Sequence, residues 1–466
     1  MVPGQSKPVT LECVEMKIRV IYDPLLRQVT KPVTEFGGSL KETAAQMRRL
    51  MHQKKGMGLA ANQIGLDAQL LVMERAREKD DDLPEIPFLA LTNPRIVKLS
   101  RETVLMNEGC LSLPGLELPV SRPIAVVVEG QNTDGQPVKI KAKGLKARVL
   151  QHEIDHLNGR LFTDRVDRRE LGKLANFNWA KIVFFGSDSF SLEILQFLRQ
   201  SGLNIQAVIT ESDKPSGRQQ SVTPTIVKAY AISEAISVFT PETKVEITDL
   251  IKQLGPELII LASYGKILSG ETLSLPLYGA LNLHPSLLPK FRGPTPIQSS
   301  ILAGEKVTGV SLIRMSAAVD AGELVAVEKT DIRPTDTTNT LKARLAALAS
   351  RLVVEQLPSY LAGQARLVVQ NSQDISQTVK LTKEMAAINW QDAPQEIDRQ
   401  IRAYNPWPKA YSYLGEKRLI FLESSFDGRL VIKKVQLEGK KPADWLDFQS
   451  GHRLELTKSP WYPKIA

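Results

Sequence analysis

The amino-acid sequence predicts a multidomain protein with an α+β domain, a Rossmann-like α/β domain and a small β-barrel. Its 466 residues suffice for about three domains of ordinary size. Three consecutive regions differ in how their apolar residues repeat along the chain. We therefore expect domains at 1–170, 180–375 and 376–466, with a short charged linker at 171–179.

The first region mixes two kinds of periodicity. The apolar spacing at 40–53 and 145–157 predicts two helices. Short alternating stretches predict strands at 103–106, 124–129 and 138–142. Because strands and helices do not alternate regularly here, we expect an α+β arrangement.

The second region alternates regularly between strand and helix patterns. Strands are expected at the apolar runs 181–186, 204–210, 236–240 and 258–263, with helices between them at 192–198, 224–233 and 245–254. Such alternation, with almost fully apolar strands, predicts a parallel sheet covered on both faces. Ligands of this fold bind at the carboxyl edge of the strands.

The third region loses this alternation. After an expected helix at 394–404 come short strand-like stretches at 410–414, 419–423 and 430–436. Several short strands in so few residues predict a small β-barrel.

The composition is that of a globular protein, with 42% hydrophobic and 24% charged residues. No apolar run approaches the ~20 residues that a membrane helix needs, and the first residues lack the apolar stretch of a signal peptide. The only cysteines are Cys13 and Cys110, as is typical of a reducing compartment. We expect a cytoplasmic protein with no membrane partner. Its net charge of +9 fits a polyanionic partner, although a basic balance also serves solubility.

A metal-binding pattern lies near the end of the first region. In the string HEIDH (152–156), His152 and His156 are four residues apart, so on a helix both imidazoles face one way and can share a metal. Glu153 beside them can exchange protons with a metal-bound water. The string alone also fits a solvated helix, because a catalytic metal needs a third ligand and an open fourth position.

Two further strings complete the pattern. Cys110 stands in EGCLSLPG (108–115), and GLAANQIG (58–65) precedes it. Together with HEIDHLNG (152–159), these strings resemble the three motifs of the peptide deformylase family in order and spacing. The resemblance covers roughly residues 16–165 and implies that Cys110 is the third ligand.

The resemblance to peptide deformylases implies a role for each matching residue. Cys110, His152 and His156 would bind the metal, which is Fe(II) in the family, with zinc and nickel as alternative occupants. Glu153 would be the general acid and base. A metal-bound hydroxide would attack the formyl carbon of an N-formylmethionyl peptide.

Other positions of the same motifs also match the family. The side-chain amide of Gln63 and the backbone N–H of Leu111 would donate to the tetrahedral oxyanion. Gly58 and Gly109 suit places where the backbone must come close to the substrate. Asn62 stands where many relatives have proline, and we expect no chemical consequence. The charged residues Arg101, Arg122 and Asp155 are explained as well by a salt-bridged surface as by a role in the site.

The second region carries a different set of reactive side chains. Asn282 and His284 lie two apart in LNLHPSLLPKFRGPTPIQ (281–298), so on a strand they face the same side. Asp320 follows in VDAGEL (319–324). This region has no Ser-His-Asp triad, no phosphate-binding loop and no zinc spacing. The single glycine in KIVFFGSDSF does not support dinucleotide binding.

These strings resemble the folate-dependent formyltransferases. The resemblance implies that an amine attacks the formyl carbon of 10-formyltetrahydrofolate without a covalent enzyme intermediate. Asn282 would donate to the oxyanion, His284 would polarise or protonate it, and Asp320 would orient His284 and help to take the amine proton. The segment that borders the folate matches Ser286, Leu287, Leu288 and Pro289.

Two features indicate that the acceptor is methionyl initiator tRNA. DKPSGRQQ (213–220) is similar to the loop with which methionyl-tRNA formyltransferases enter the acceptor stem, and Arg218 stands at that motif's arginine. Gln219 and Gln220 replace lysines that are common there, which implies a weaker grip on phosphates. KLTKEMAAINW (380–390) and IRAYNPWPKA (401–410) match the start of the family's C-terminal oligonucleotide-binding-type barrel, which implies tRNA binding at 376–466.

The sequence therefore predicts a bifunctional translation-initiation enzyme. One half would formylate methionyl initiator tRNA, and the other would remove formyl from N-formylmethionyl nascent peptides at the ribosome. Two alternatives remain open. The second half could formylate a sugar nucleotide, or one half could be a non-catalytic module that binds tRNA or the ribosome.

Overall fold

The structure is a computed structural model that describes the chain except for residues 1–15, 78–82, 167–179, 217–220, 459–460 and 463–466. The chain divides into two compact units. The first consists of Met1–Phe177 and Pro358–Ala365, and the second of Asn178–Leu357 and Arg366–Ala466. The predicted linker at 171–179 lies outside the described residues. Among the described helices, none combines the length and apolar character needed to span a bilayer.

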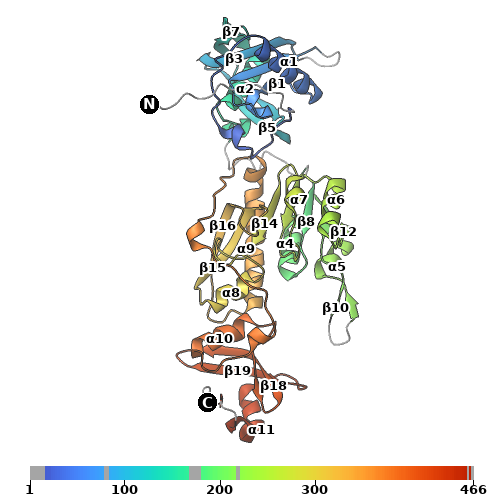
Figure 1. Cartoon of the computed structure of the whole chain (residues 1–466), viewed down its shortest axis with the longest axis vertical. Helices are drawn as coiled ribbons and strands as arrows, with labels where there is room; N and C mark the ends of the chain where they lie inside the picture. The colour runs from blue at the N-terminus through green and yellow to red at the C-terminus, as the bar shows by residue number, and fades with distance from the viewer. Residues whose placement is uncertain (1–15, 78–82, 167–179, 217–220, 459–460, 463–466) are drawn as a thin grey trace. The chain divides into compact units, whose positions relative to one another are not determined.

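Within its described residues, the first unit contains two sheets and two long helices, which Figure 1 shows. Its elements are η1 (Pro24–Arg27), α1 (Gly38–Gln53), β1 (Gly58–Ala60), η2 (Ala61–Ile64), β2 (Leu70–Arg75), β3 (Ile86–Leu99), β4 (Thr103–Cys110), β5 (Leu113–Pro123), β6 (Ala125–Gln131), β7 (Pro137–Lys143), α2 (Gly144–Leu157) and η3 (Phe162–Arg165). An antiparallel sheet has the order β1-β2-β3-β6-β7, and β4 and β5 form a separate hairpin. The predicted α+β class is confirmed.

Apolar side chains of α2 hold this helix on the first sheet. Leu150, Ile154 and Leu157 recur at helical spacing and pack in one cluster with Leu71 and Val128 of the sheet. His152 and His156 occupy the same helix, so the packing of α2 fixes the direction in which their imidazoles point.

The second unit begins with an α/β domain. Its elements are β8 (Ile182–Phe185), α4 (Ser189–Gln200), β9 (Ile205–Ile209), β10 (Lys214–Ser216), β11 (Ser221–Thr223), α5 (Ile226–Ser233), β12 (Ser237–Phe239), α6 (Lys244–Leu254), β13 (Leu258–Leu261), α7 (Gly270–Ser274), β14 (Ala280–His284), α8 (Pro296–Leu302), β15 (Val307–Arg314), β16 (Glu323–Asp331) and α9 (Thr338–Leu361). The main sheet has the order β12-β9-β8-β13-β14-β15-β16.

The first five strands of this order are parallel, as predicted, whereas β15 and β16 are antiparallel additions. All four residues of both β8 and β13 are buried, which explains why their sequences are continuously apolar. β14 is the last parallel strand and ends at His284. The predicted active-site strand therefore ends at the carboxyl edge, where this fold binds ligands.

The C-terminal part of the second unit contains α10 (Pro394–Ala403), β17 (Tyr411–Leu414), β18 (Lys417–Phe426), β19 (Leu430–Leu437), β20 (Ala443–Asp444) and α11 (Trp445–Thr457). The four strands form an antiparallel sheet in chain order, consistent with the predicted small barrel. Helix α11 was not predicted from the sequence. Its Trp445, Phe448 and Leu456 are buried in the same core as Phe421 of β18.

Candidate active sites

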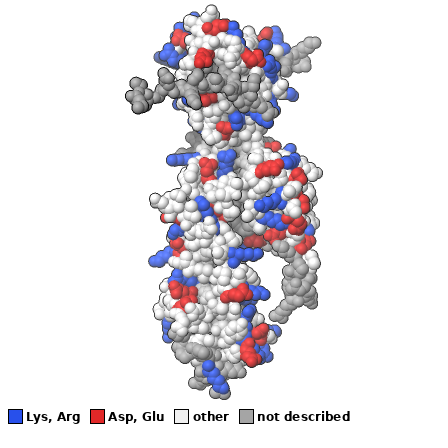
Figure 2. Space-filling view, viewed as in Figure 1, with Lys and Arg blue, Asp and Glu red and all other residues white. Residues whose placement is uncertain are grey.

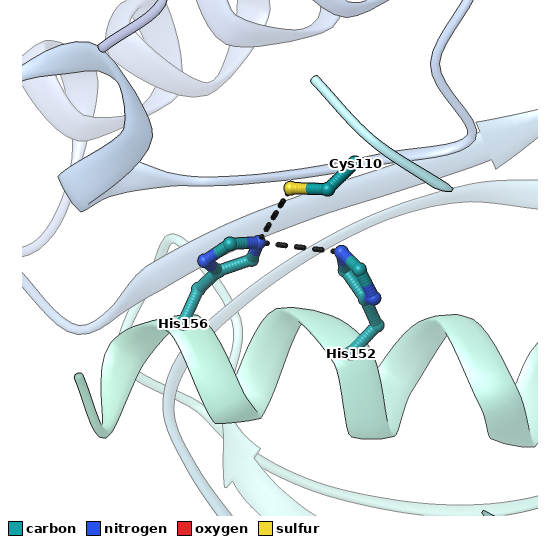
Figure 3. Close-up of side chains that lie close together, drawn as sticks. All are labelled: Cys110, His152 and His156. Carbon is teal, nitrogen blue, oxygen red and sulfur yellow. Dashed lines mark hydrogen bonds between the residues drawn. The ribbon is translucent and has the colours of Figure 1, made fainter. Parts of the chain in front are cut away.

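Three potential metal ligands meet beside α2. Cys110 ends β4, and His152 and His156 lie one turn apart on α2. The Nε2 atom of His156 is 3.2 Å from the Cys110 Sγ atom and 3.2 Å from the His152 Nε2 atom. Figure 3 shows the three side chains pointing toward one another. Since a tetrahedral ion with ordinary bond lengths separates its ligand atoms by about 3.4–3.6 Å, the residues fit a metal.

Glu153 supplies a buried carboxyl group at the same helix turn. The residue is 3% exposed, and burial raises the pKa of Glu153 to about 7. Its Oε2 atom receives no hydrogen bond from the described part of the chain. A Cβ atom at Gly58 would lie 2.2 Å from the Oε1 atom, so this glycine leaves room for the Glu153 carboxyl group, and the expected approach of the substrate to Gly58 remains a prediction. A carboxyl group in this state can take and return a proton near neutral pH.

The surroundings of the two histidines shift their pKa values in opposite directions. Burial lowers the pKa of His156 well below its usual value, which keeps the imidazole neutral as a ligand must be. Burial alone would lower the pKa of His152 as well, but hydrogen bonds with Cys110 and Glu108 raise it to about 10. Because a metal ligand must be neutral, metal binding would displace this proton from His152.

The two predicted oxyanion donors lie beside the thiol. Gln63 lies in η2, with its Nε2 atom 3.5 Å from the Cys110 Sγ atom and 3.1 Å from the Ser112 Oγ atom. Its Oε1 atom accepts a hydrogen bond from the Ala60 N–H at 2.9 Å, which fixes the orientation of the amide. Leu111 directly follows Cys110 in the turn before β5. Their service as donors to an oxyanion remains a prediction.

A buried network of charges lies behind the metal ligands. Glu108 places its Oε2 atom 3.1 Å from the His152 Nδ1 atom. Arg122 is fully buried and donates to Glu108 at 2.6 and 2.8 Å and to Asp155 at 2.7 Å. Burial alone would raise the pKa of Glu108, but the hydrogen bonds from His152 and Arg122 lower it to about 2. Arg122 and Asp155 therefore belong to the interior, and the surface interpretation of these two charges is wrong.

Asn62 has a structural role that the sequence did not reveal. The residue is fully buried, and its Nδ2 atom donates to the His156 carbonyl oxygen at 2.6 Å. The side chain thus ties η2 to the last turn of α2, directly behind the potential ligand His156. Because its partner is 94 residues away, no local pattern predicts the contact.

In the second unit, the structure brings together the three predicted transfer residues. Asn282 and His284 lie on β14, and Asp320 lies in the loop between β15 and β16. The Asn282 Nδ2 atom donates to the Asp320 Oδ1 atom at 3.1 Å. The His284 Nδ1 atom lies 3.5 Å from the Asp320 Oδ2 atom. Asp320 has a φ of 50°, a left-handed conformation that is unusual for a residue other than glycine.

Backbone groups of the loop after β14 hold both His284 and Asp320. The His284 Nε2 atom lies 2.9 Å from the carbonyl oxygen of Phe291, which can only accept. Nε2 is therefore the donor in this contact, and Nδ1 is the nitrogen that faces Asp320. The Gly293 N–H donates to the Asp320 Oδ2 atom at 2.8 Å.

The segment predicted to border the folate follows His284. Ser286 and Leu288 are buried, and Leu287 and Pro289 are half-buried. The Ser286 hydroxyl donates to the Lys290 carbonyl oxygen at 2.8 Å, so it is engaged within the protein. Within this segment, the surface that a ligand could contact therefore belongs to Leu287 and Pro289.

The predicted tRNA contact, Arg218, lies outside the described residues. The flanking strands β10 and β11 pair in register and form a hairpin that projects from the α/β domain (Figure 1). Figure 2 shows basic and acidic side chains interspersed over the visible face, without a large patch of one sign.

Sequence models of three families match the chain in succession. Polypeptide deformylase matches residues 15–171, formyl transferase matches residues 180–357, and the formyl transferase C-terminal domain matches residues 380–429. A methionyl-tRNA formyltransferase of Methylacidiphilum infernorum is 37% identical over 309 residues, which are 59% of this chain and 96% of the relative. The chain belongs to the methionyl-tRNA formyltransferase family. A peptide deformylase domain precedes this part in the same polypeptide.

Further relatives and solved structures each match one part of the chain. A methionyl-tRNA formyltransferase of Dehalococcoides mccartyi is 36% identical over 310 residues, which are 60% of this chain and 97% of the relative. Crystal structures of peptide deformylases from Thermotoga maritima and Thermus thermophilus are each 39% identical to the part they match and cover 33% of this chain, with TM-scores of 0.30. The chain covers 97% and 86% of those two proteins.

Proposed function

We propose that this chain is a bifunctional translation-initiation enzyme. Its first unit hydrolyses the formyl group from N-formylmethionyl peptides, and its second unit transfers formyl to the amino group of methionyl initiator tRNA. The observation that supports the proposal is that both units bring a complete set of reacting side chains together. One set is the ligand trio beside Glu153, and the other is the group formed by Asn282, His284 and Asp320.

In the deformylase site, the protein's own residues manage protons and charge. When bound to Cys110, His152 and His156, a metal supplies Lewis acidity that activates water and polarises the formyl oxygen. The Glu153 carboxylate takes the proton of the attacking water and returns it to the departing amine, so that formate and a free N-terminus are released. The Gln63 amide and the Leu111 N–H donate to the oxygen that gains negative charge.

The donor set also bears on which metal is bound. One thiolate and two imidazoles suit Fe(II), zinc and nickel alike, so geometry alone does not select among them. We propose Fe(II), on the strength of the resemblance to peptide deformylases. Metal analysis of protein purified without oxygen tests this choice, and zinc or nickel at full occupancy would contradict it.

In the transfer site, the amine nitrogen bonds to the formyl carbon of 10-formyltetrahydrofolate, and the bond from that carbon to the folate nitrogen breaks. Asn282 retains one amide proton beyond its bond to Asp320, and this proton can serve the oxyanion. The amine proton goes to the Nδ1 atom of His284, where the adjacent Asp320 stabilises the resulting imidazolium. The His284 imidazolium then returns this proton to the folate nitrogen as it leaves, which restores the neutral imidazole.

The C-terminal region favours tRNA over a sugar nucleotide as the acceptor. It matches the C-terminal domain of formyl transferases, and it exposes Lys433, Lys434, Lys440 and Lys441, which suit phosphate contacts. The projecting hairpin β10–β11 carries the stretch with Arg218, which we propose as a further contact to the acceptor stem. In proteins of this fold, a nucleotide phosphate usually binds at the start of the first helix, which here is α4. The Asp188 carboxylate occupies that position, because it accepts a hydrogen bond from the Ser191 N–H at 3.1 Å. A carboxylate there disfavours the phosphate of a sugar nucleotide.

The proposal assigns a task to each predicted domain. Residues 1–170 carry deformylation, 180–375 carry formyl transfer and 376–466 bind tRNA, with 171–179 as the linker. Both substrates belong to the translation machinery, with the nascent peptide presented at the ribosome, so we propose a cytoplasmic location.

Two assays on one preparation of the full chain test the proposal. Deformylation of an N-formylmethionyl peptide and formylation of methionyl-tRNA should both proceed, and an amino-sugar nucleotide should not accept formyl. Formylation of the sugar nucleotide alone would support the first alternative. Binding of tRNA without any transfer would support the non-catalytic alternative for the second half.

A further inference from the structure

The segment that joins the α/β domain to the C-terminal sheet lies against the transfer site. Residues 366–379 form no long helix or strand, and they fall between the two formyl transferase matches, which end at 357 and resume at 380. We name residues 366–379 the connecting segment. It first pairs with the start of β16, because Leu324 and Val368 exchange backbone hydrogen bonds of 2.8 and 2.9 Å.

Gln370 of the connecting segment reaches the backbone around Asp320. The residue is 8% exposed. Its Nε2 atom donates to the Asp320 carbonyl oxygen at 2.8 Å and to the Gly322 carbonyl oxygen at 2.7 Å. Both amide protons are thus used to hold one short stretch of loop, which includes the left-handed residue Asp320.

The other end of the Gln370 amide binds the second loop of the site. The Oε1 atom of Gln370 accepts from the Arg292 side chain at 2.6 and 3.2 Å. Arg292 lies between Phe291, whose carbonyl oxygen binds His284, and Gly293, whose N–H binds Asp320. With carbonyl acceptors on one side and a guanidinium donor on the other, only one orientation of the amide satisfies all these contacts.

Further along, the connecting segment also holds the loop that contains Arg292. The Phe291 N–H donates to the Ser376 Oγ atom at 2.8 Å. Backbone hydrogen bonds of 2.9 and 2.7 Å join Arg292 to Ser376 and to Thr378. The loop that fixes the proton on His284 is therefore itself held by residues 376–378.

We infer that Gln370 is a positioning residue for formyl transfer, and that the connecting segment completes the transfer site. The inference rests on the proposed function of the second unit. Gln370 does not touch the reacting groups. It acts by clamping the backbone of Asp320 to the loop of Arg292, so that the carboxylate stays in line with Asn282 and His284. A misplacement of catalytic groups by a fraction of an ångström is enough to slow an enzyme.

The test compares Gln370→Met with Gln373→Met in the full chain. Both changes remove the same amide from the same segment, but Gln373 is exposed and its side chain holds no loop of the site. The deformylase activity of the same preparation measures the concentration of intact chains, and the rate of formyl transfer is expressed relative to it. We expect Gln370→Met to lower kcat for formyl transfer by about 10- to 100-fold, with KM for methionyl-tRNA and for the formyl donor within about threefold. Gln373→Met should match the parent.

Two more variants distinguish a loss of alignment from a folding defect. Gln370→Glu keeps the shape and the acceptor for Arg292 but sets a carboxylate against two carbonyl oxygens, so kcat should fall at least as far. Ser376→Ala removes only the acceptor for the Phe291 N–H and should lower kcat by about 3- to 10-fold. Thermal unfolding of each variant separates lost fold from lost alignment.

Each outcome has a distinct meaning. If the parent transfers formyl and Gln370→Met stays within twofold of Gln373→Met, the inference is overturned while the proposed function stands. A rise in KM with unchanged kcat, or a rate that falls only with the folded fraction, also overturns it. If the parent deformylates but transfers no formyl to methionyl-tRNA, the proposed function of the second unit fails, and the inference fails with it.

Discussion

The metal site and the transfer site differ in what holds their reacting side chains. At the metal site, His152 is backed by the carboxylate of Glu108, which is held in turn by the buried guanidinium of Arg122. At the transfer site, Asp320 and His284 are held by main-chain groups of Gly293 and Phe291. The first arrangement depends on ion pairs in the protein interior. The second depends on backbone groups of loops, and therefore on the conformation of those loops.

This difference follows from the chemistry that each unit performs. A metal binds to deprotonated ligands, so the protein must control charge around them, and a carboxylate behind an imidazole raises its basicity and fixes its tautomer. A transfer site formed by Asn282, His284 and Asp320 must instead place donors and acceptors accurately around a developing oxyanion. The two sites should therefore respond differently to substitutions in their surroundings.

The largest effect that separates the sites is expected for Glu153→Gln. The amide keeps the size of the side chain and leaves the three ligands intact, but it cannot take a proton from water. We expect deformylation to fall by roughly 100- to 10,000-fold. Metal content and formyl transfer should match the parent, as measured by elemental analysis and by the tRNA assay on the same sample. Full deformylase activity in this variant would remove Glu153 from the mechanism.

Asp320→Asn should produce the next largest effect, confined to the other activity. The neutral amide cannot stabilise an imidazolium at His284, and it also disturbs the contact with Asn282. We expect formyl transfer to fall by roughly 100- to 1,000-fold, with deformylation unchanged. Steady-state assays of both reactions check this. A transfer rate within a few-fold of the parent would exclude Asp320 from the chemistry.

Two pairs of reacting residues could be predicted because their spacing is local, whereas Cys110 and Asp320 were assigned from the family resemblances. The four-residue step from His152 to His156 fixes their common face on a helix, and the two-residue step from Asn282 to His284 does so on a strand. The same logic predicted α1, α2 and the first parallel strands. Strands β15 and β16 and helix α11 were not predicted, because their positions depend on tertiary contacts with the rest of the sheet or core.

The supporting residues could not be predicted, because their partners are distant in the sequence. Arg122 meets Glu108 and Asp155 at separations of 14 and 33 residues, and Gln370 meets Asp320 at 50. An arginine in a β-strand is usually exposed, which is why the surface interpretation of Arg122 was reasonable from sequence. Only the folded chain shows that two carboxylates converge on it.

The charge network predicts a smaller effect on the metal site. Arg122→Met leaves Glu108 with Arg148 and leaves Asp155 with Arg165, so each buried carboxylate keeps one cationic partner. We expect metal affinity to fall by about 10- to 100-fold, because His152 is less firmly held. A metal-competition titration measures this, and formyl transfer should not change.

The matched control for this variant is Arg95→Met. Arg95 lies in β3 of the same unit and pairs with Glu129, but its side chain is 76% exposed. Exposed pairs contribute about 0–1 kcal/mol, so the control should bind metal like the parent. Equal metal affinity in the two variants would show that the buried network does not support the site.

The smallest effect is expected for Asn62→Ala. This change removes the hydrogen bond to the carbonyl oxygen of His156, which still accepts from the Gly159 N–H at 2.9 Å, so the loss is that of one ordinary hydrogen bond, about 0.5–1.5 kcal/mol. Because the ligand atoms themselves are untouched, we expect a lower unfolding temperature for the first unit and at most a few-fold loss of deformylation. Thermal unfolding followed together with deformylase activity distinguishes the two. A loss of deformylation as large as that of Glu153→Gln would mean that the backbone of η2 aligns the reacting groups of the metal site. Loops align the reacting groups of the transfer site in the same way. The contrast between the two sites would then no longer hold.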